Sequence, residues 1–175
     1  MHSEKNDSWR VRDDDQTHEP VRFVQMWVVP DEPGLTPGYE QLEVDHELLA
    51  GGLVPIASGM NAYKDHAAIR INNKKAAMHV ARVQPGHTVT VPEAPYLHVF
   101  VTQGVAEMEG VGELYEGDAV RLSNSGGQTL TSHDGCTSSA RMAIPLVAQL
   151  VCGPVVVLLQ GEVSLIAVVA NLVAA

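Results

Sequence analysis

Short apolar runs separated by turn residues fill the chain between residues 53 and 131. No stretch keeps the 3.6-residue spacing of an amphipathic helix, and the runs have the length of strands. Short strands broken repeatedly by Gly, Pro, Asn and Asp are typical of a sandwich or barrel. The pattern therefore predicts an all-β domain with strands at 53–57, 68–71, 76–83, 89–91, 97–102, 105–109, 112–114, 119–122 and 128–131.

Turn residues separate these predicted strands. Pro85-Gly86 predicts a turn that also contains His87, and Lys74-Lys75 predicts a solvated turn. Gly117-Asp118 predicts a tight turn before a strand, with the Asp118 carboxylate accepting hydrogen bonds from nearby backbone amides.

The pattern changes on the amino-terminal side of this domain. Residues 1–20 are polar, and the Asp13–Asp15 triplet is expected in a loop. The segment 23–29 is apolar on both faces, which predicts a strand buried on both sides. If that strand closes a different barrel, the apolar face around Trp27 drives self-association. Residues 39–44 alternate and suit a half-exposed strand or arm.

The tail from residue 142 to 175 is rich in Val, Ala and Leu, and Glu162 is its only charged residue. Three interpretations compete: a substitute barrel strand followed by a self-associating segment, a membrane anchor across residues 144–161, or a packed C-terminal helix. We favour the first, expect the tail to add at most one strand to the domain at 53–131, and expect a chain ending near Val151 to keep the fold.

The net charge of the chain argues against two classes of binding partner. The formal net charge is −10, and no stripe of Lys and Arg occurs, which argues against direct binding to nucleic acid or to an anionic membrane surface. Cys136 and Cys152 cannot define a disulfide framework, and the N-terminus is polar and acidic, so we expect a cytoplasmic protein. No G-x-S-x-G motif or phosphate-binding loop supports hydrolysis or nucleotide binding.

His2 and Glu4 are the candidate metal ligands. Residues i and i+2 of a strand project to the same face, so the two side chains can present a nitrogen and an oxygen to one ion. That mixture suits Fe, Mn or Zn, although a metal centre usually needs at least three protein ligands. The alternative is a solvated chain end.

Three blocks in the same order resemble the middle of a pirin: residues 2–6 (HSEKN), 21–30 (VRFVQMWVVP) and 34–41 (GLTPGYEQ). Pirins are bicupins, in which one metal, usually iron, is held in the first of two barrels by three His and one Glu. The resemblance implies a cupin double-stranded β-helix, or jelly roll. It also implies that residues 1–38 are a remnant of the metal-binding barrel, that 39–135 form the second barrel, and that 136–175 are a tail of uncertain structure.

By this resemblance His2 and Glu4 match the last His and the Glu of the family's metal set, with Glu4 also the possible catalytic base. The earlier H-x-H pair has no counterpart in the chain. Iron, or another divalent metal, is the implied cofactor, and a flavonoid-like molecule is the implied substrate of an intact relative.

The second barrel is expected to lack metal ligands. It offers His87, Glu93 and His98 without H-x-H spacing, and residues 123–128 (SNSGGQ) stand where a further His is expected. His79 and His98 lie in apolar runs and are expected to be satisfied barrel residues.

Two functions follow from the resemblance. One is a dioxygenase-like enzyme domain, related to iron-dependent quercetin 2,3-dioxygenases, without a complete metal site or independent activity. The other is a non-catalytic module that binds a protein partner, as the transcriptional co-regulators of the family do. The product of a truncated gene is a further alternative.

Overall fold

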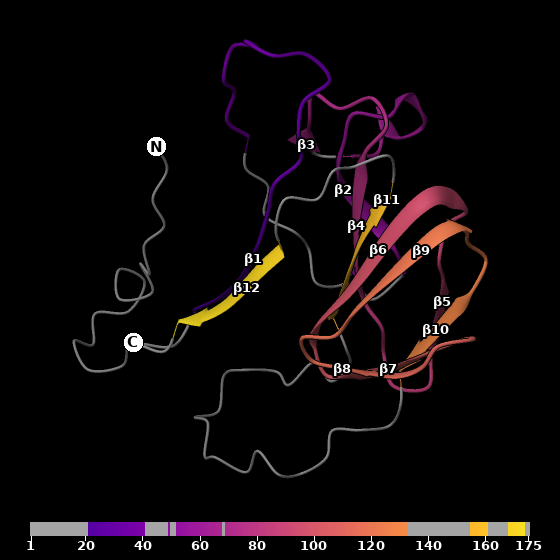
Figure 1. Ribbon diagram of the computed structural model, residues 1–175. Coiled ribbons are helices and arrows are strands. Elements are labelled where there is room, and N and C mark those ends of the chain that lie inside the picture. The colour runs from indigo at the N-terminus through magenta and orange to yellow at the C-terminus, as the bar shows by residue number, and fades with distance from the viewer. Residues whose placement is uncertain are drawn as a thin grey trace. The chain divides into compact units, whose positions relative to one another are not determined.

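The structure is a computed structural model that describes residues 21–40, 49, 52–67, 69–132, 155–160 and 168–173. The chain divides into two compact units, residues 1–27 with 165–175 and residues 28–164. The first unit holds an antiparallel pair, β1 (Val21–Met26) and β12 (Val168–Val173), shown in Figure 1. A strand therefore covers most of the segment predicted at 23–29, and the Asp13–Asp15 triplet lies outside the described residues.

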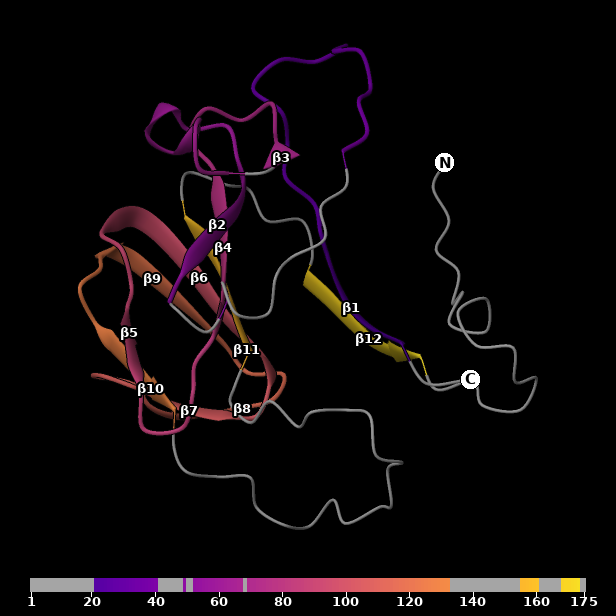
Figure 2. The ribbon, with the colours of Figure 1, turned by 180° about the vertical axis from the view of Figure 1, so that it is seen from behind.

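The second unit consists of two sheets. The larger follows the order β3-β2-β4-β11-β6-β9, and Figure 2 shows its central strands side by side. Its strands are β2 (Val54–Ser58), β3 (Ile69–Arg70), β4 (Ala77–Arg82), β6 (Ala94–Gln103), β9 (Ala119–Ser125) and β11 (Val155–Gln160). The smaller follows the order β5-β10-β7-β8, with β5 (Thr88–Thr90), β7 (Val105–Met108), β8 (Gly112–Tyr115) and β10 (Thr129–Ser132). A 3-10 turn, η2 (Asn61–Tyr63), joins β2 to β3.

The all-β prediction is confirmed, because each of the nine strands predicted between residues 53 and 131 overlaps an observed strand. Alternate side chains of these strands point to opposite faces, so each sheet buries every second residue. The shared core is apolar and draws on both sheets: Ala81, Val83, Val91, Ala94, Leu97, Val99, Val101, Ala106, Met108, Leu114 and Leu130. Burying each large member contributes about 1.5–3 kcal/mol.

The predicted turns form as expected. The backbone N–H of Tyr115 donates to the Asp118 carboxylate at 2.8 Å, and Gly117 supplies the positive φ of 92° that the turn requires. Gly86 has a φ of 72°, and His87 follows it with an exposed side chain. These turns fix where β5 and β9 begin.

Residues 28–40 form an arm held against the connection between β3 and β4. The backbone N–H of Asp31 donates to the Asn72 carbonyl at 2.8 Å, and the Asp31 carboxylate accepts from the N–H of Lys74 at 2.8 Å. The buried side chain of Asn73 donates to the Val29 carbonyl at 2.9 Å. Lys74 thus lies in the exposed turn predicted for the lysine pair.

One expectation about the amino-terminal side is wrong in part. Trp27 is 48% exposed and Val29 is 44% exposed, so the segment 23–29 is not buried throughout. Of the half-exposed strand or arm expected at 39–44, residues 39 and 40 belong to the arm, and Tyr39 is 85% exposed. Residues 41–44 fall outside the described residues.

The tail supplies a central strand. β11 pairs antiparallel with both β4 and β6, placing Leu158 opposite His79 on one side and Val99 on the other. The substitute strand is therefore confirmed, and a packed C-terminal helix is wrong, because residues 155–160 and 168–173 are strands. Most of the segment considered as a membrane anchor, residues 144–154, lies outside the described residues. Within the described ranges no helix is long and apolar enough to cross a membrane.

His79 on β4 is buried, with 4% of its surface exposed. Its ring meets that of Tyr63 edge to face, with centroids 5.0 Å apart, and its Nδ1 has no hydrogen-bond partner among the described residues. Burial lowers the pKa of His79 to about 4. The expectation of a barrel histidine is confirmed, but the expectation that its hydrogen bonds are satisfied is wrong.

The position of β11 contradicts the expectation that a chain ending near Val151 keeps the fold. Removing β11 separates β4 from β6 and leaves both with unpaired backbone groups, each costing about 1–3 kcal/mol where buried. We expect the thermal midpoint of a chain ending at Val151 to fall by more than about 8 °C. A chain ending at Ser164 keeps β11 and serves as the control in thermal unfolding followed by circular dichroism. Equal midpoints for the two truncations would contradict this role.

His79 makes stability depend on pH. Its imidazole stays neutral in the folded state down to pH about 4 but is protonated below pH 6.5 in the unfolded state, so stability falls as pH drops from 6.5 towards 4. We expect a loss of about 2 kcal/mol between pH 7 and pH 5 in urea titrations. His79→Leu reduces this dependence, because only the lowered pKa of His98 then contributes in the same direction, whereas His87→Leu, at an exposed turn, retains it in full. An unchanged slope in His79→Leu would refute the assignment.

Candidate functional site

His2 and Glu4, the predicted metal ligands, lie outside the residues that the structure describes. Their roles as metal ligands, and that of Glu4 as base, stay predictions.

The interior of the described barrel does not fit a metal ion. Most inward positions on β4 and β6 carry apolar side chains, among them Ala81, Leu97, Val99 and Val101, which have no donor atom for a metal. His79 is the exception, because it lies two residues before Ala81 on β4 and is buried on the same face. Within the described ranges, no three His, Cys, Asp or Glu residues lie close enough to share an ion, so His79 has no set of ligands to complete a site.

The polar residues singled out in this barrel are dispersed. His87 and Glu93 are exposed on the turns that flank β5. His98 lies on β6 between the inward-facing Leu97 and Val99, so it points to the opposite face of the sheet, where it pairs across strands with Arg121 of β9. The structure does not bring the three together as ligands.

His98 has an unusual environment. Neither ring nitrogen has a hydrogen-bond partner among the described residues, so the expectation of a satisfied histidine is wrong here too. Burial, and to a smaller extent the positive charge of Arg121, lowers the pKa of His98. The imidazole is therefore neutral at pH 7.

The loop at 123–128, where a further His is expected in the family, has a structural role. A side chain at Gly126 would place Cβ within 2.2 Å of the Glu93 backbone, so only glycine permits this approach. Backbone hydrogen bonds between Val91 and the loop, 2.8 Å to Gly127 and 2.9 Å to Gln128, hold the two segments together.

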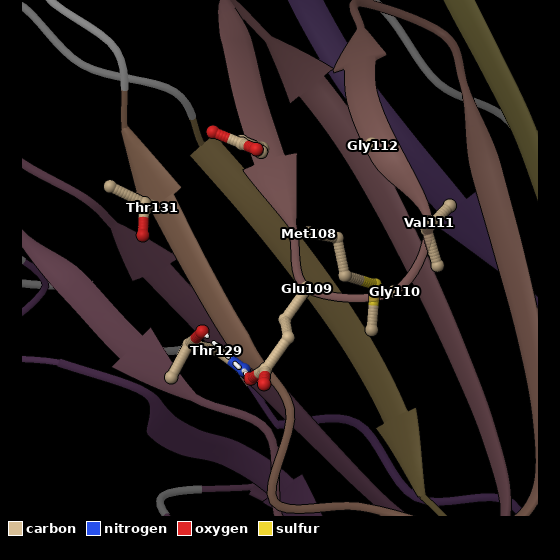
Figure 3. A pocket seen from close by; sticks show the side chains of 8 residues that line it. Met108, Glu109, Gly110, Val111, Gly112, Thr129 and Thr131 are labelled. Atoms are coloured by element: carbon tan, nitrogen blue, oxygen red, sulfur yellow. Dashed lines mark hydrogen bonds between the residues drawn. The ribbon is translucent and has the colours of Figure 1, made fainter.

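A pocket of about 500 Å³ lies on the outer side of the smaller sheet, along the β7–β8 hairpin and β10 (Figure 3). Its lining residues are Glu107, Met108, Glu109, Gly110, Val111, Gly112, Thr129 and Thr131. The Glu109 carboxylate turns towards Thr129, accepting from its N–H at 3.1 Å and from its hydroxyl at 3.0 Å (Figure 3). Glu109 is thereby fixed at the rim of the pocket.

The pocket belongs to a continuous polar surface that we call the acidic sheet face. It consists of Glu109 in the β7–β8 turn and of the polar outward side chains of the smaller sheet, namely Thr88, Thr90, Glu107, Glu113, Tyr115, Thr129 and Thr131. Val105, which lies opposite Tyr115, also points outwards and is apolar and half-buried. The register aligns Thr88, Thr131, Glu107 and Glu113 in one row across four strands. The hydroxyls of Thr88 and Thr131 lie 2.9 Å apart.

Tyr115 completes this face. Its hydroxyl donates to the Glu113 carboxylate at 2.7 Å, and this hydrogen bond, followed by the charge of Glu113, raises the pKa of Tyr115. This face was not among the predicted sites, although the sequence contains one signal for it. Between Arg82 and Arg121 the chain has six acidic residues and no Lys or Arg.

The chain is similar to known proteins in sequence and in fold. No protein-family model matches it. Proteins of Mycobacterium tuberculosis (strain H37Rv) and Mycobacterium bovis, each named "Putative quercetin 2,3-dioxygenase", are 48% identical to it over 134 residues, which is 77% of this chain and 51% of each relative. The chain thus spans about half the length of these relatives.

Two solved structures have a fold similar to that of this chain. YhhW from Escherichia coli superimposes with a TM-score of 0.57 at 16% identity, over 78% of this chain and 48% of that one. The bacterial pirin YhhW in complex with nickel(II) gives a TM-score of 0.52 at 13% identity, over 75% and 47%. With this sequence identity and this shared fold, the chain belongs to the pirin family of cupin proteins.

Proposed function

We propose that this cupin chain is related in function to quercetin 2,3-dioxygenases but has neither a complete metal site nor independent activity. The observation that carries the proposal is the apolar interior of the described barrel, where Leu97, Val99 and Val101 occupy inward positions. Any metal centre must then be built from residues outside this barrel. The proposal assigns residues 1–38 to a remnant of a metal-binding barrel, residues 39–135 together with β11 to a second barrel, and the protein to the cytoplasm.

His2 and Glu4 are the proposed contribution of this chain to an iron site, with the remaining ligands supplied by other protein residues. A divalent metal is supported by the relative solved with nickel(II), and a flavonol by the name of the mycobacterial relatives. Bound iron would supply Lewis acidity and a path for electrons between the flavonol and O₂. Glu4 would accept the proton of the flavonol hydroxyl, for which its carboxylate must lie within hydrogen-bond reach.

A second function, a non-catalytic module that binds a protein partner, is favoured by the acidic sheet face. This face is exposed, is rich in carboxylates and includes the aromatic ring of Tyr115, which is 53% exposed. Tyrosine is enriched where proteins bind one another, because it combines apolar area with a hydrogen-bonding group.

Metal analysis tests the first function. The purified full chain should hold less than one equivalent of iron after gel filtration and show no quercetinase activity, because two ligands leave an ion largely hydrated. His2→Ala should leave both results unchanged, and His87→Ala, at an exposed turn, is the matched control.

One equivalent of iron that is abolished by His2→Ala but retained by His87→Ala would refute an incomplete site. Ligands from a neighbouring subunit would then have to be sought. Quercetinase activity in the chain alone would refute the absence of independent activity.

A further inference from the structure

We propose that four polar side chains on the outer face of β6 and β9, Tyr96, His98, Arg121 and Ser123, bind a small oxyanion, namely the phosphate or carboxylate group of a small molecule. The site is separate from the proposed iron ligands and from the acidic sheet face. The proposal goes beyond both proposed functions and depends on neither.

The register of β6 and β9 brings the four side chains together. The two strands run side by side and antiparallel at one edge of the larger sheet (Figures 1 and 2). Tyr96 lies opposite Ser123 and His98 lies opposite Arg121, and residues two apart on a strand share a face. The four positions therefore form an array of about 4.8 by 6.7 Å, which suits one oxyanion group rather than an extended chain.

His98 is the observation that points to a ligand. Both of its ring nitrogens are buried, and neither has a hydrogen-bond partner among the residues that the structure describes. A buried polar group without a partner costs free energy, and a neutral imidazole carries one N–H donor that an anionic oxygen can accept. Neighbouring side chains have to move before an anion reaches the ring, and exposed side chains change rotamer within nanoseconds.

Arg121, Tyr96 and Ser123 supply further donors. Arg121 and Ser123 are exposed, and Tyr96 is 52% exposed. In the described part of the chain, the side chains of Arg121 and Tyr96 make no hydrogen bond or ion pair. A guanidinium group presents its N–H groups as a fork that matches the oxygens of a carboxylate or phosphate, and the two hydroxyls can donate to the same group.

The charge of the larger sheet favours an anion at this place. The chain has a net charge of −10, yet the six strands of the larger sheet contain no Asp or Glu, and their charged residues are Arg70, Arg82 and Arg121. An anion at the β6–β9 edge therefore has Arg121 beside it and meets no carboxylate from these strands.

The protonation of His98 supplies a signature of binding. Burial, followed by the charge of Arg121, lowers the pKa of His98 in the unliganded chain. The positions around His98 on its face are Tyr96 and Phe100 on β6, Arg121 on β9 and Leu159 on β11, so Arg121 is the charged neighbour. A bound anion favours the protonated imidazolium and is expected to raise the pKa of His98.

Nuclear magnetic resonance of the His98 ring tests the proposal on the full chain, with the ring signal assigned by its loss in His98→Gln. Inorganic phosphate and acetate are titrated separately at constant ionic strength, with chloride as the blank. We expect the ring signal to shift to saturation and the pKa of His98 to rise in the bound state. Saturation with phosphate alone identifies a phosphate group as the ligand, saturation with acetate alone identifies a carboxylate, and saturation with both supports a general oxyanion site. A response to both salts no different from that to chloride would overturn the proposal.

Matched variants separate the site from the general charge of the chain. Arg121→Gln should weaken binding about tenfold, because a charge-assisted hydrogen bond is lost, and Tyr96→Phe about fivefold. Arg70→Gln makes the same charge change on β3, at the opposite edge of the same sheet, and Tyr115→Phe removes an exposed hydroxyl from the other sheet. Both controls should weaken binding less than about twofold.

His98→Leu tests the role of the ring, with binding followed by the backbone amide signals of β9. It should abolish saturable binding and leave the thermal midpoint unchanged or raise it, because two unpartnered nitrogens are removed. Retained binding in His98→Leu would contradict the site, and so would equal weakening by Arg121→Gln and Arg70→Gln. If His98→Leu does not fold, the comparison of the two exposed arginines still decides.

Discussion

The alternation of side chains across the strands is the constraint on which this molecule depends. In β4 and β6 most of the residues that point inwards are small or aliphatic, with the buried His79 as an exception, so the two sheets close on one largely apolar core. The same alternation sends His98 to the opposite face and the glutamates of β7 and β8 to the outside. The apolar core and the lack of a set of metal ligands among the described residues are thus two consequences of one pattern.

The larger sheet is continuous only because a segment from the far end of the chain enters it. β11 lies between β4 and β6, which are joined to each other through β5 and its flanking turns. A strand of such long sequence separation forms late and costs loop-closure entropy, which the backbone hydrogen bonds on both of its sides must offset. Its apolar composition, which also suited a membrane anchor, suits a strand with a neighbour on each side.

The charges on the outer surface of the smaller sheet do not follow the pattern that would stabilise the sheet most. Side chains at exposed positions do not have to fill a core, and opposite charges across neighbouring strands would stabilise the sheet. The chain instead places Glu107 opposite Glu113 and supplies no basic residue from the four strands. These carboxylates lie at exposed positions, where solvent screens their repulsion, beside the exposed Tyr115.

The sequence by itself determined the class of fold, the strand positions between residues 53 and 131, the Asp118 turn and the family, because these depend on local periodicity, on turn chemistry and on ordered sequence blocks. Only the tertiary structure decided that residues 155–160 fill the centre of a sheet and that Glu107 faces Glu113. Partners in a sheet are chosen by register between distant segments, and no local pattern encodes that choice. For the same reason the hydrogen bonds of His79 and His98 were misjudged, since an apolar run predicts burial but not which polar atoms lie within reach.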